Sequence, residues 1–558
     1  MESMIKETRE KMEFFLKQKK YFYLLLITAL FSYGFMIVHP TIGIDDTSTM
    51  RYFTDGVSPV AGRWCIFLIN KVFHIAEFAP FVTEVASIII LVLSVTLWCV
   101  VFARVLENRV GIMGYAIFAS LFLSAPVLSE VYTYYLHNGI SIAYGVTAFA
   151  VLLFLYAMEC EASWKYILGS GIALTVAVGF YESMLVVYVI GVIMVYLLIW
   201  ITGRQKEYKT NVIRWIISGI ITAAFTLVLR SLIRNAMIVI FGLQDQIGVL
   251  PVRSMGEISQ WFDGTSTLSD FFMLLKRFWL MYYVNAIVYF PVTMFVLAAV
   301  ILVCYGVYKA IRKRNLWILV CVAGILGGPW IMLVIEGYTT HYRASQYIPP
   351  VCGFAALLIA YEINAISKVK IRRIACVAGN LLGVIFIYNQ ASEMNKCFYV
   401  DYLKYEDARN TMNSIAWELE AHYDTGKPVI IRGSYEVPYG IVKDVYVDAG
   451  TWQYQLIKSI VDPIDPHLME KYYSQSGYGY FFSETPLISV IDWGVNAFDD
   501  TNVEFFKFWE MHGHSFVMET DLEKYEEAQQ KMTELQMPSW PEEGYIVELE
   551  EYIIVNLG

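Results

Sequence analysis

Hydrophobic residues dominate the first two thirds of the chain, in long runs separated by short polar segments. Each run approaches or exceeds the roughly 20 residues that a helix needs to cross the hydrocarbon core of a bilayer. The runs lie at residues 21–38, 81–103, 111–128, 139–158, 166–181, 184–201, 212–241, 284–308, 316–335, 348–366 and 374–390. This pattern predicts an α-helical polytopic membrane protein with about eleven transmembrane helices.

Basic residues occupy every second connection between these runs. They are the Lys and Arg residues of the N-terminus (residues 1–20) and those at positions 104 and 109, 165, 204–209, 309–314 and 368–373. Because basic loops stay in the cytoplasm, this alternation places the N-terminus inside and the acidic loops outside. We therefore expect a multi-pass membrane protein with a cytoplasmic N-terminus. An odd number of spans would put everything after residue 390 outside the cell.

Residues 391–558 lack a spanning run and read as a separate domain. Helical periodicity extends over Tyr402–His422, Val503–His512 and Leu522–Met537, and short β-rich runs lie at Pro428–Arg432, Ile488–Ile491, Tyr545–Val547 and Ile553–Val555. These patterns predict an extracytoplasmic α/β domain beyond the transmembrane domain of residues 21–390. Two further stretches, 63–73 and 255–280, mix charged and apolar residues as helices lying in the membrane surface do.

Composition narrows the possible partners. Hydrophobic residues make up 57% of the 558 residues and the mean hydropathy is +0.51, so membrane lipid is the principal solvent. A net charge of −10 argues against a nucleic-acid partner. The eight cysteines and the dispersed histidines show no zinc-ligand spacing, and no P-loop is present. The sequence requires no cofactor and predicts no metal site, and it leaves the need for a divalent cation open.

The segment His39–Thr47 carries adjacent carboxylates, Asp45 and Asp46, directly after the first hydrophobic run. Paired carboxylates are unfavourable within hydrocarbon, so the pair is expected at one membrane face, where a carboxylate can act as a general base. Without further information, the residues alone favour a solvated helix stop or a turn over a catalytic pair.

Several short motifs resemble one known family. They are Gly43–Thr47 with Arg51-Tyr52 and Gly62–Trp64, the tyrosine-rich loop 129–138, the bend Gly179–Ser183, and the ending from Met537-Pro538 to Val555. Together they resemble the GtrII-like glucosyltransferases, membrane enzymes of the GT-C superfamily. The resemblance implies a GT-C-like membrane domain in a bacterial plasma membrane, a polyprenyl-phosphate sugar donor and a cell-envelope glycan acceptor. It also implies that Asp46 and Asp45 are catalytic, one as the base and the other orienting it.

Substrate-binding candidates come from the remaining outer loops. A departing lipid phosphate needs cations or hydrogen-bond donors, which favours Arg343 with His341, and Arg63. The alternative is an arginine that extends to the interface beside an aromatic belt. Carboxylates near span ends, Glu130 and Glu182, are further candidates, although a structural ion pair or a helix cap fits them equally.

Tyr132 and His137 of the tyrosine-rich loop complete the predicted set. A tyrosine there can stack on a sugar, but belts at the membrane interface have the same composition.

These observations predict an inverting glycosyltransferase that moves a hexosyl unit, glucosyl by resemblance, from a polyprenyl phosphate to an extracytoplasmic glycan. A transporter or flippase of lipid-linked sugars is the alternative. The odd span count and the lack of visible repeats stand against it. A non-catalytic envelope assembly protein is a third possibility, disfavoured by the acidic residues of the outer loops.

Overall fold

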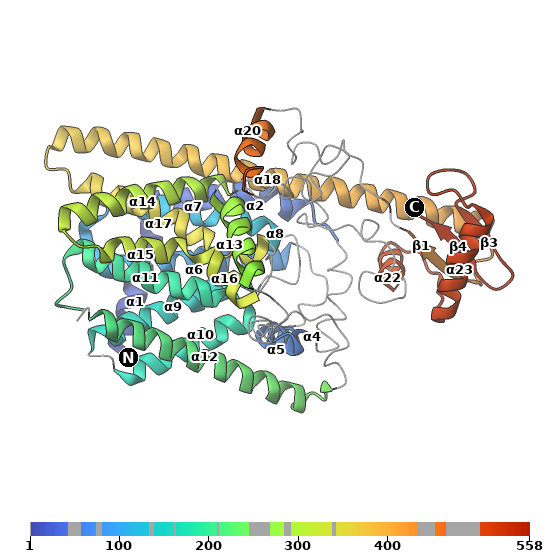
Figure 1. Ribbon diagram of the computed structural model, residues 1–558, viewed down its shortest axis with the longest axis horizontal. Helices are drawn as coiled ribbons and strands as arrows, with labels where there is room; N and C mark the ends of the chain where they lie inside the picture. The colour runs from blue at the N-terminus through green and yellow to red at the C-terminus, as the bar shows by residue number, and fades with distance from the viewer. Residues whose placement is uncertain are drawn as a thin grey trace.

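The computed structural model describes residues 2–42, 57–73, 81–132, 139–160, 163–208, 211–244, 268–283, 292–336, 342–433, 435, 452–464 and 503–558. A bundle of helices fills one side of the molecule, and a small domain containing a β-sheet lies at the far end of one very long helix (Figure 1). The chain is thus a mostly helical protein with a mixed sheet near its C-terminus. This confirms the predicted fold class in outline.

Seven of the described helices are long and apolar enough to cross a bilayer. They are α2 (Lys19–Val38), α6 (Val82–Leu106), α9 (Ile140–Glu159), α11 (Met184–Thr202), α12 (Val212–Ile240), α14 (Thr293–Lys313) and α18 (Val369–His422). An eighth candidate span is the pair α15 (Trp317–Leu326) and α16 (Gly328–Glu336), which is bent by 60°. The protein is therefore a multi-pass membrane protein with seven or eight candidate spans by length and composition.

Three of the eleven predicted spans correspond to shorter helices: α7 (Ile112–Leu123), α10 (Trp164–Phe180) and α17 (Ile348–Asn364). Helix α7 is buried along most of its length and packs against α2, α6 and α17. Protein surrounds such a helix, so neighbouring elements can satisfy its terminal backbone groups where lipid could not. Its hydrophobic run continues after a break into α8 (Val127–Tyr132).

Charged residues at the end of the bundle away from the C-terminal domain pair with one another. The amphipathic helix α1 (Glu2–Lys17) and a short 3₁₀ turn, η1 (Glu107–Arg109), belong to this end. Arg104 contacts Glu7 of α1 and Glu159 of α9, both at 2.6 Å, and Lys309 contacts Glu362 at 2.6 Å. These ion pairs connect neighbouring helices, and their basic residues Arg104 and Lys309 are among those predicted to lie at the cytoplasmic face.

The stretch 63–73 forms the helix α5 (Trp64–Phe73), as predicted, after the single turn α4 (Val57–Val60). Part of the second stretch, 255–280, is seen as α13 (Leu268–Tyr283). A 3₁₀ turn, η5 (Tyr342–Ala344), leads into α17.

Helix α18 joins the bundle to the C-terminal domain. It has 54 residues, about 80 Å at ~1.5 Å per residue, and crosses the predicted domain boundary at residue 390 without a break. Its first half packs on α2 and α7, and buried residues of its last turns, such as Met412 and Leu419, belong to the core of the C-terminal domain. One continuous helix, α18, therefore connects the bundle to the C-terminal domain (Figure 1).

The C-terminal domain contains a four-stranded sheet of order β2-β1-β4-β3. Strand β1 (Pro428–Arg432) runs parallel to β2 (Val517–Met518) and β4 (Ile553–Asn556), and β3 (Ile546–Glu548) pairs antiparallel with β4. The domain also contains α22 (Val503–Met511) and α23 (Leu522–Leu535), and α20 (Trp452–Val461) is a further described helix. Strands β1, β3 and β4 and helices α22 and α23 confirm the predicted elements, whereas Ile488–Ile491 lies outside the described residues.

Candidate functional site

Five of the nine residues predicted for the site can be placed: Arg63, Glu130, Tyr132, Glu182 and Arg343. They lie at the end of the bundle from which α18 continues to the C-terminal domain, called here the near end. The remaining four, Asp45, Asp46, His137 and His341, lie outside the described residues. The last described residue before the acidic pair, Ile42, packs against the core of the C-terminal domain.

The first ion pair of the near end joins Arg343 to Glu130. The turn η5 packs on α8, which brings Arg343 Nη1 to 3.7 Å from Glu130 Oε1. The Glu130 side chain is only 2% exposed. Behind the arginine, the Gln346 amide donates to the Arg343 carbonyl at 2.6 Å, and the Tyr144 hydroxyl contacts both oxygens of Gln346 at 2.7 Å. The backbone that carries Arg343 is therefore held by buried hydrogen bonds.

A second cluster of three charged residues joins the first loop to the α10–α11 break and to α12. The two oxygens of Glu182, in the break between α10 and α11, contact different arginines: Oε2 lies 3.4 Å from Arg63 Nε, and Oε1 accepts from Arg230 Nη2 at 3.0 Å. The Arg63 guanidinium also lies 4.9 Å from the centre of the Tyr181 ring. The sequence predicted Arg63 and Glu182 as separate candidates, and the structure brings them into one cluster.

The two groups are close enough to influence each other. Burial lowers the pKa of Arg63, but the Glu182 carboxylate and the Tyr181 ring outweigh that effect, so the net pKa is raised. The positive charge of Arg343 acts in the opposite direction. Two arginines from distant parts of the sequence thus lie within electrostatic range of each other. Paired guanidinium groups of this kind suit an anion with several oxygens, such as a phosphate.

Tyr132 lies inside the bundle. Its hydroxyl contacts Ser141 Oγ at 2.5 Å and Ser87 Oγ at 3.4 Å, and its ring packs 4.9 Å from the ring of Tyr33. The side chain is 4% exposed. These contacts place Tyr132 in the packing beneath Glu130, and its role as a substrate contact stays a prediction.

Sequence reasoning missed three charged residues near this site. Arg230 was hidden in the hydrophobic run 212–241, although an ionisable residue inside a span is itself a functional signal. Asp401 and Lys404 of α18 are also buried, at 1% and 3% exposure. Asp401 and Glu130 both lie within electrostatic range of Cys397, which locates this part of α18 beside the Arg343 pair.

One comparison with known proteins gives a family. The family model described as Glucosyl transferase GtrII matches residues 34–360, more than half of the chain. The chain belongs to the GtrII glucosyl transferase family. This confirms the resemblance seen in the short motifs and identifies the protein as a glucosyltransferase-family enzyme.

The match contains all nine predicted site residues and Arg230, whereas the α18 extension and the C-terminal domain lie beyond it. No curated protein matches the GtrII-family chain.

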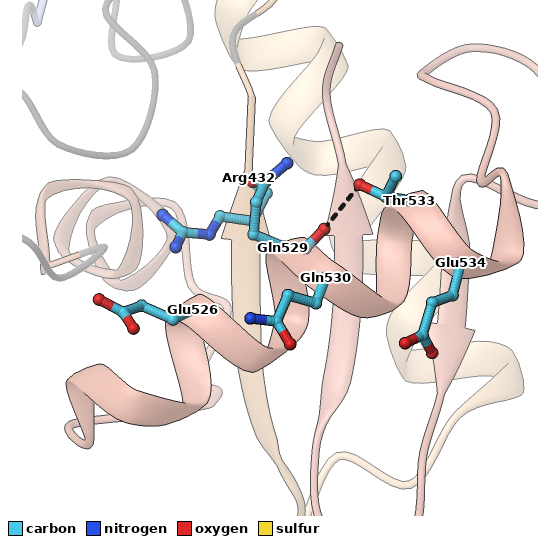
Figure 2. A pocket seen from close by; sticks show the side chains of 6 residues that line it. All are labelled: Arg432, Glu526, Gln529, Gln530, Thr533 and Glu534. Atoms are coloured by element: carbon cyan, nitrogen blue, oxygen red, sulfur yellow. Dashed lines mark hydrogen bonds between the residues drawn. The ribbon is translucent and has the colours of Figure 1, made fainter.

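An open groove lies on the C-terminal domain of this GtrII-family protein. It has a volume of about 690 Å³ and is lined by Arg432 of β1 and by Glu526, Gln529, Gln530, Thr533 and Glu534 of α23. Figure 2 shows the side chains of α23 together with Arg432, the last residue of β1, beside the helix. Every lining residue can form hydrogen bonds. Within the described residues, no group of three His, Cys, Asp or Glu side chains is placed to hold a metal ion.

Proposed function

We propose that the protein is an inverting glycosyltransferase that moves a hexosyl unit, glucosyl in the first instance, from a polyprenyl phosphate to an extracytoplasmic cell-envelope glycan. One observation carries the proposal beyond family membership: Arg63 and Arg343 lie within electrostatic range of each other at the near end of a membrane bundle. A lipid-linked phosphate would reach this place from the bilayer.

The proposed chemistry is a single displacement. An acceptor hydroxyl oxygen attacks the anomeric carbon while the bond from that carbon to the phosphate oxygen breaks. The proton of the hydroxyl passes to a carboxylate of the Asp45-Asp46 pair, and the bonding electrons leave with the phosphate. Negative charge therefore grows on the phosphate in the transition state, and prepositioned cations lower the barrier most at such a position.

Each remaining site residue receives a role in this proposal. Arg63 and Arg343 bind the phosphate, and Glu182 and Glu130 orient them through the observed ion pairs. His341 follows as a second phosphate contact because it precedes Arg343 by two positions, and His137 and Tyr132 are assigned to binding of the sugar.

We also propose the finer topology expected from the sequence. Eleven spans result if α7, α10 and α17 cross the bilayer together with the eight longer candidates. With basic loops in the cytoplasm, the near end and the C-terminal domain then face outward, where an envelope glycan is available.

The C-terminal domain is proposed to recognise the acceptor through the groove beside α23. Amide, hydroxyl, carboxylate and guanidinium groups match the many hydroxyls of a glycan, and every lining residue of the groove carries one of them (Figure 2). Replacing Gln529 and Gln530 together by Ala should raise the KM for the acceptor and leave the KM for the donor unchanged. Glu523→Ala, on the same helix but outside the groove, is the matched control. An unchanged acceptor KM would assign recognition elsewhere.

The decisive test of the function is transfer by the purified protein from radiolabelled polyprenyl-phosphate hexoses to isolated envelope glycan. Transfer of glucose with inversion at the anomeric carbon is the expected result. The double variant Asp45→Asn with Asp46→Asn is the control for contaminating activity. Movement of the donor across vesicles without transfer would instead select the flippase, and transfer from a nucleotide sugar alone would overturn the proposed donor.

A further inference from the structure

The stripe of α12 that faces the bundle contains an arginine, Arg230, that had no part in the site predicted from the sequence. Most of α12 is exposed at the bundle surface, but its buried positions follow one line: Trp215, Ser218, Thr222, Thr226, Arg230, Met237 and Ile238. Arg230 is 7% exposed and lies on this line. A buried charge is costly unless it is paired, so the contacts of Arg230 indicate its role.

Arg230 holds the loop that carries Arg63. Its Nη2 donates to the Ala61 carbonyl at 3.2 Å, and a Cβ added to Gly62 would lie only 2.2 Å from the same nitrogen. Gly62 has φ +88°, a conformation that favours glycine. The guanidinium is therefore packed directly on the loop backbone, one residue before Arg63.

Arg230 also binds one of the two carboxylate oxygens of Glu182. Because Oε1 is held by Arg230 at 3.0 Å, only Oε2 faces Arg63, at 3.4 Å from Nε. Within the part of the chain that the structure describes, the two terminal nitrogens of Arg63 carry no hydrogen bond. A carboxylate released from Arg230 could instead turn both oxygens to Arg63 in a bidentate pair, which is the preferred geometry of arginine with carboxylates.

We propose that Arg230 is a positioning residue that restrains Glu182 and thereby keeps the terminal nitrogens of Arg63 available to the phosphate of the lipid donor. The inference rests on the proposed function, because it assigns Arg63 to the phosphate. Arg230 acts through Glu182, the contact with the Ala61 carbonyl holds the Arg230 guanidinium in place, and Arg230 does not itself touch the substrate.

If Arg230 restrains Glu182, the effects of Arg230→Gln and Glu182→Gln on phosphate binding should not be additive. Arg230→Gln should weaken binding of the lipid phosphate about 10-fold, the scale of one lost hydrogen bond to a charged group, because Glu182 then competes for Arg63. In a Glu182→Gln background the competing carboxylate is absent, so Arg230→Gln should have little further effect. Residues that act through one another show such coupling, whereas independent anchors are additive.

The experiment measures binding of a sugar-free polyprenyl phosphate to the purified full chain in detergent, for the parent, both single variants and the double variant. Arg230→Lys keeps a charge near Glu182 and should restore part of the affinity. Arg234→Gln is the comparison for loop anchoring alone, because Arg234 donates to the Val60 carbonyl at 2.7 Å and makes no bond to Glu182 in the described structure. Its effect should be additive with Glu182→Gln. A diacyl phospholipid in place of the polyprenyl phosphate tests for general lipid binding.

Coupling between Arg230 and Glu182, with partial recovery in Arg230→Lys, is the expected result. If the parent binds and Arg230→Gln binds equally well, or its loss is additive with Glu182→Gln, the positioning role is wrong while the proposed donor stands. If the parent binds polyprenyl phosphate no better than the phospholipid, the proposed donor itself is overturned, and the role of Arg230 with it.

Discussion

Gly62→Ala offers the most direct probe of the loop that carries Arg63. The substitution adds one methyl group at a residue whose φ is +88°. That methyl would lie 2.2 Å from Arg230 Nη2 and 2.6 Å from its Cζ, well inside van der Waals contact. The rigid loop and the buried guanidinium cannot both stay in place, so we expect Arg230 to be displaced from Ala61 and Glu182.

The cost can be worked from these contacts. A side chain in the left-handed region costs roughly 1–2 kcal/mol. Loss of the neutral hydrogen bond to Ala61 costs about 1 kcal/mol, and loss of the charged one to Glu182 costs about 1.5–3 kcal/mol. Both charged side chains are at most 13% exposed, so solvent compensates little. Gly62→Ala should therefore cost about 3.5–6 kcal/mol locally, an unusually large effect for one methyl group.

Gly203 provides the matched control. It ends α11 with φ +80°, and nothing lies within 4 Å of the position where its Cβ would be. Gly203→Ala thus carries the backbone cost of about 1–2 kcal/mol without the collision. The assays are thermal unfolding of the purified protein, followed by tryptophan fluorescence, and the KM for the lipid donor.

Gly62→Ala should unfold at a lower temperature than Gly203→Ala and should alone raise the donor KM, by about 10-fold. Equal melting temperatures and donor KM values in the two variants would refute the claim that Arg230 is locked against the loop.

Three further predictions concern the proposed chemistry and topology. Asp45→Asn and Asp46→Asn should preserve folding, and one of them should lower kcat by roughly 100-fold or more because it removes the base; parental turnover in both and in the double variant would transfer that role to another carboxylate. Arg343→Ala should raise the donor KM more than Arg343→Lys, because lysine keeps the positive charge and loses only the bidentate geometry of the guanidinium. A stably expressed Ala variant with parental kinetics would remove Arg343 from the site. A cysteine placed at Gly426, an exposed position before β1, should react with a membrane-impermeant thiol reagent in intact cells, and labelling only after permeabilisation would reverse the orientation.

The hydrophobic pattern determined the elements that depend on local composition. A run of about 20 apolar residues satisfies its backbone only as a helix in lipid, so the spans could be located from the sequence alone. The strands β1 and β4 and the helix α23 could also be predicted, because the periodicity that indicates each of them lies within its own segment. Family membership was also recognisable, since short motifs carry it.

The boundaries of the helices and strands were harder to predict from the sequence. The run 111–128 is divided between α7 and α8, and α18 continues some thirty residues past the end of its hydrophobic run. Both outcomes depend on neighbours: α7 is surrounded by protein, and the later turns of α18 are buried first against α8 and then in the C-terminal core. Strand β2 has two residues and exists only because β1 pairs with it.

For the candidate site, too, the sequence predicted the residues and the tertiary structure decided their contacts. The sequence could nominate Arg63, Glu182 and Arg343 as charges at span ends, but each of them also fitted an ordinary interfacial residue. Only the tertiary structure decided that Glu182 joins Arg63 to Arg230 and that Arg343 pairs with Glu130. Hydropathy depends on neighbours along the chain, whereas an ion pair depends on distances of a few ångströms between distant segments. Packing of α12, α10 and the first loop fixes those distances, and no single segment encodes them.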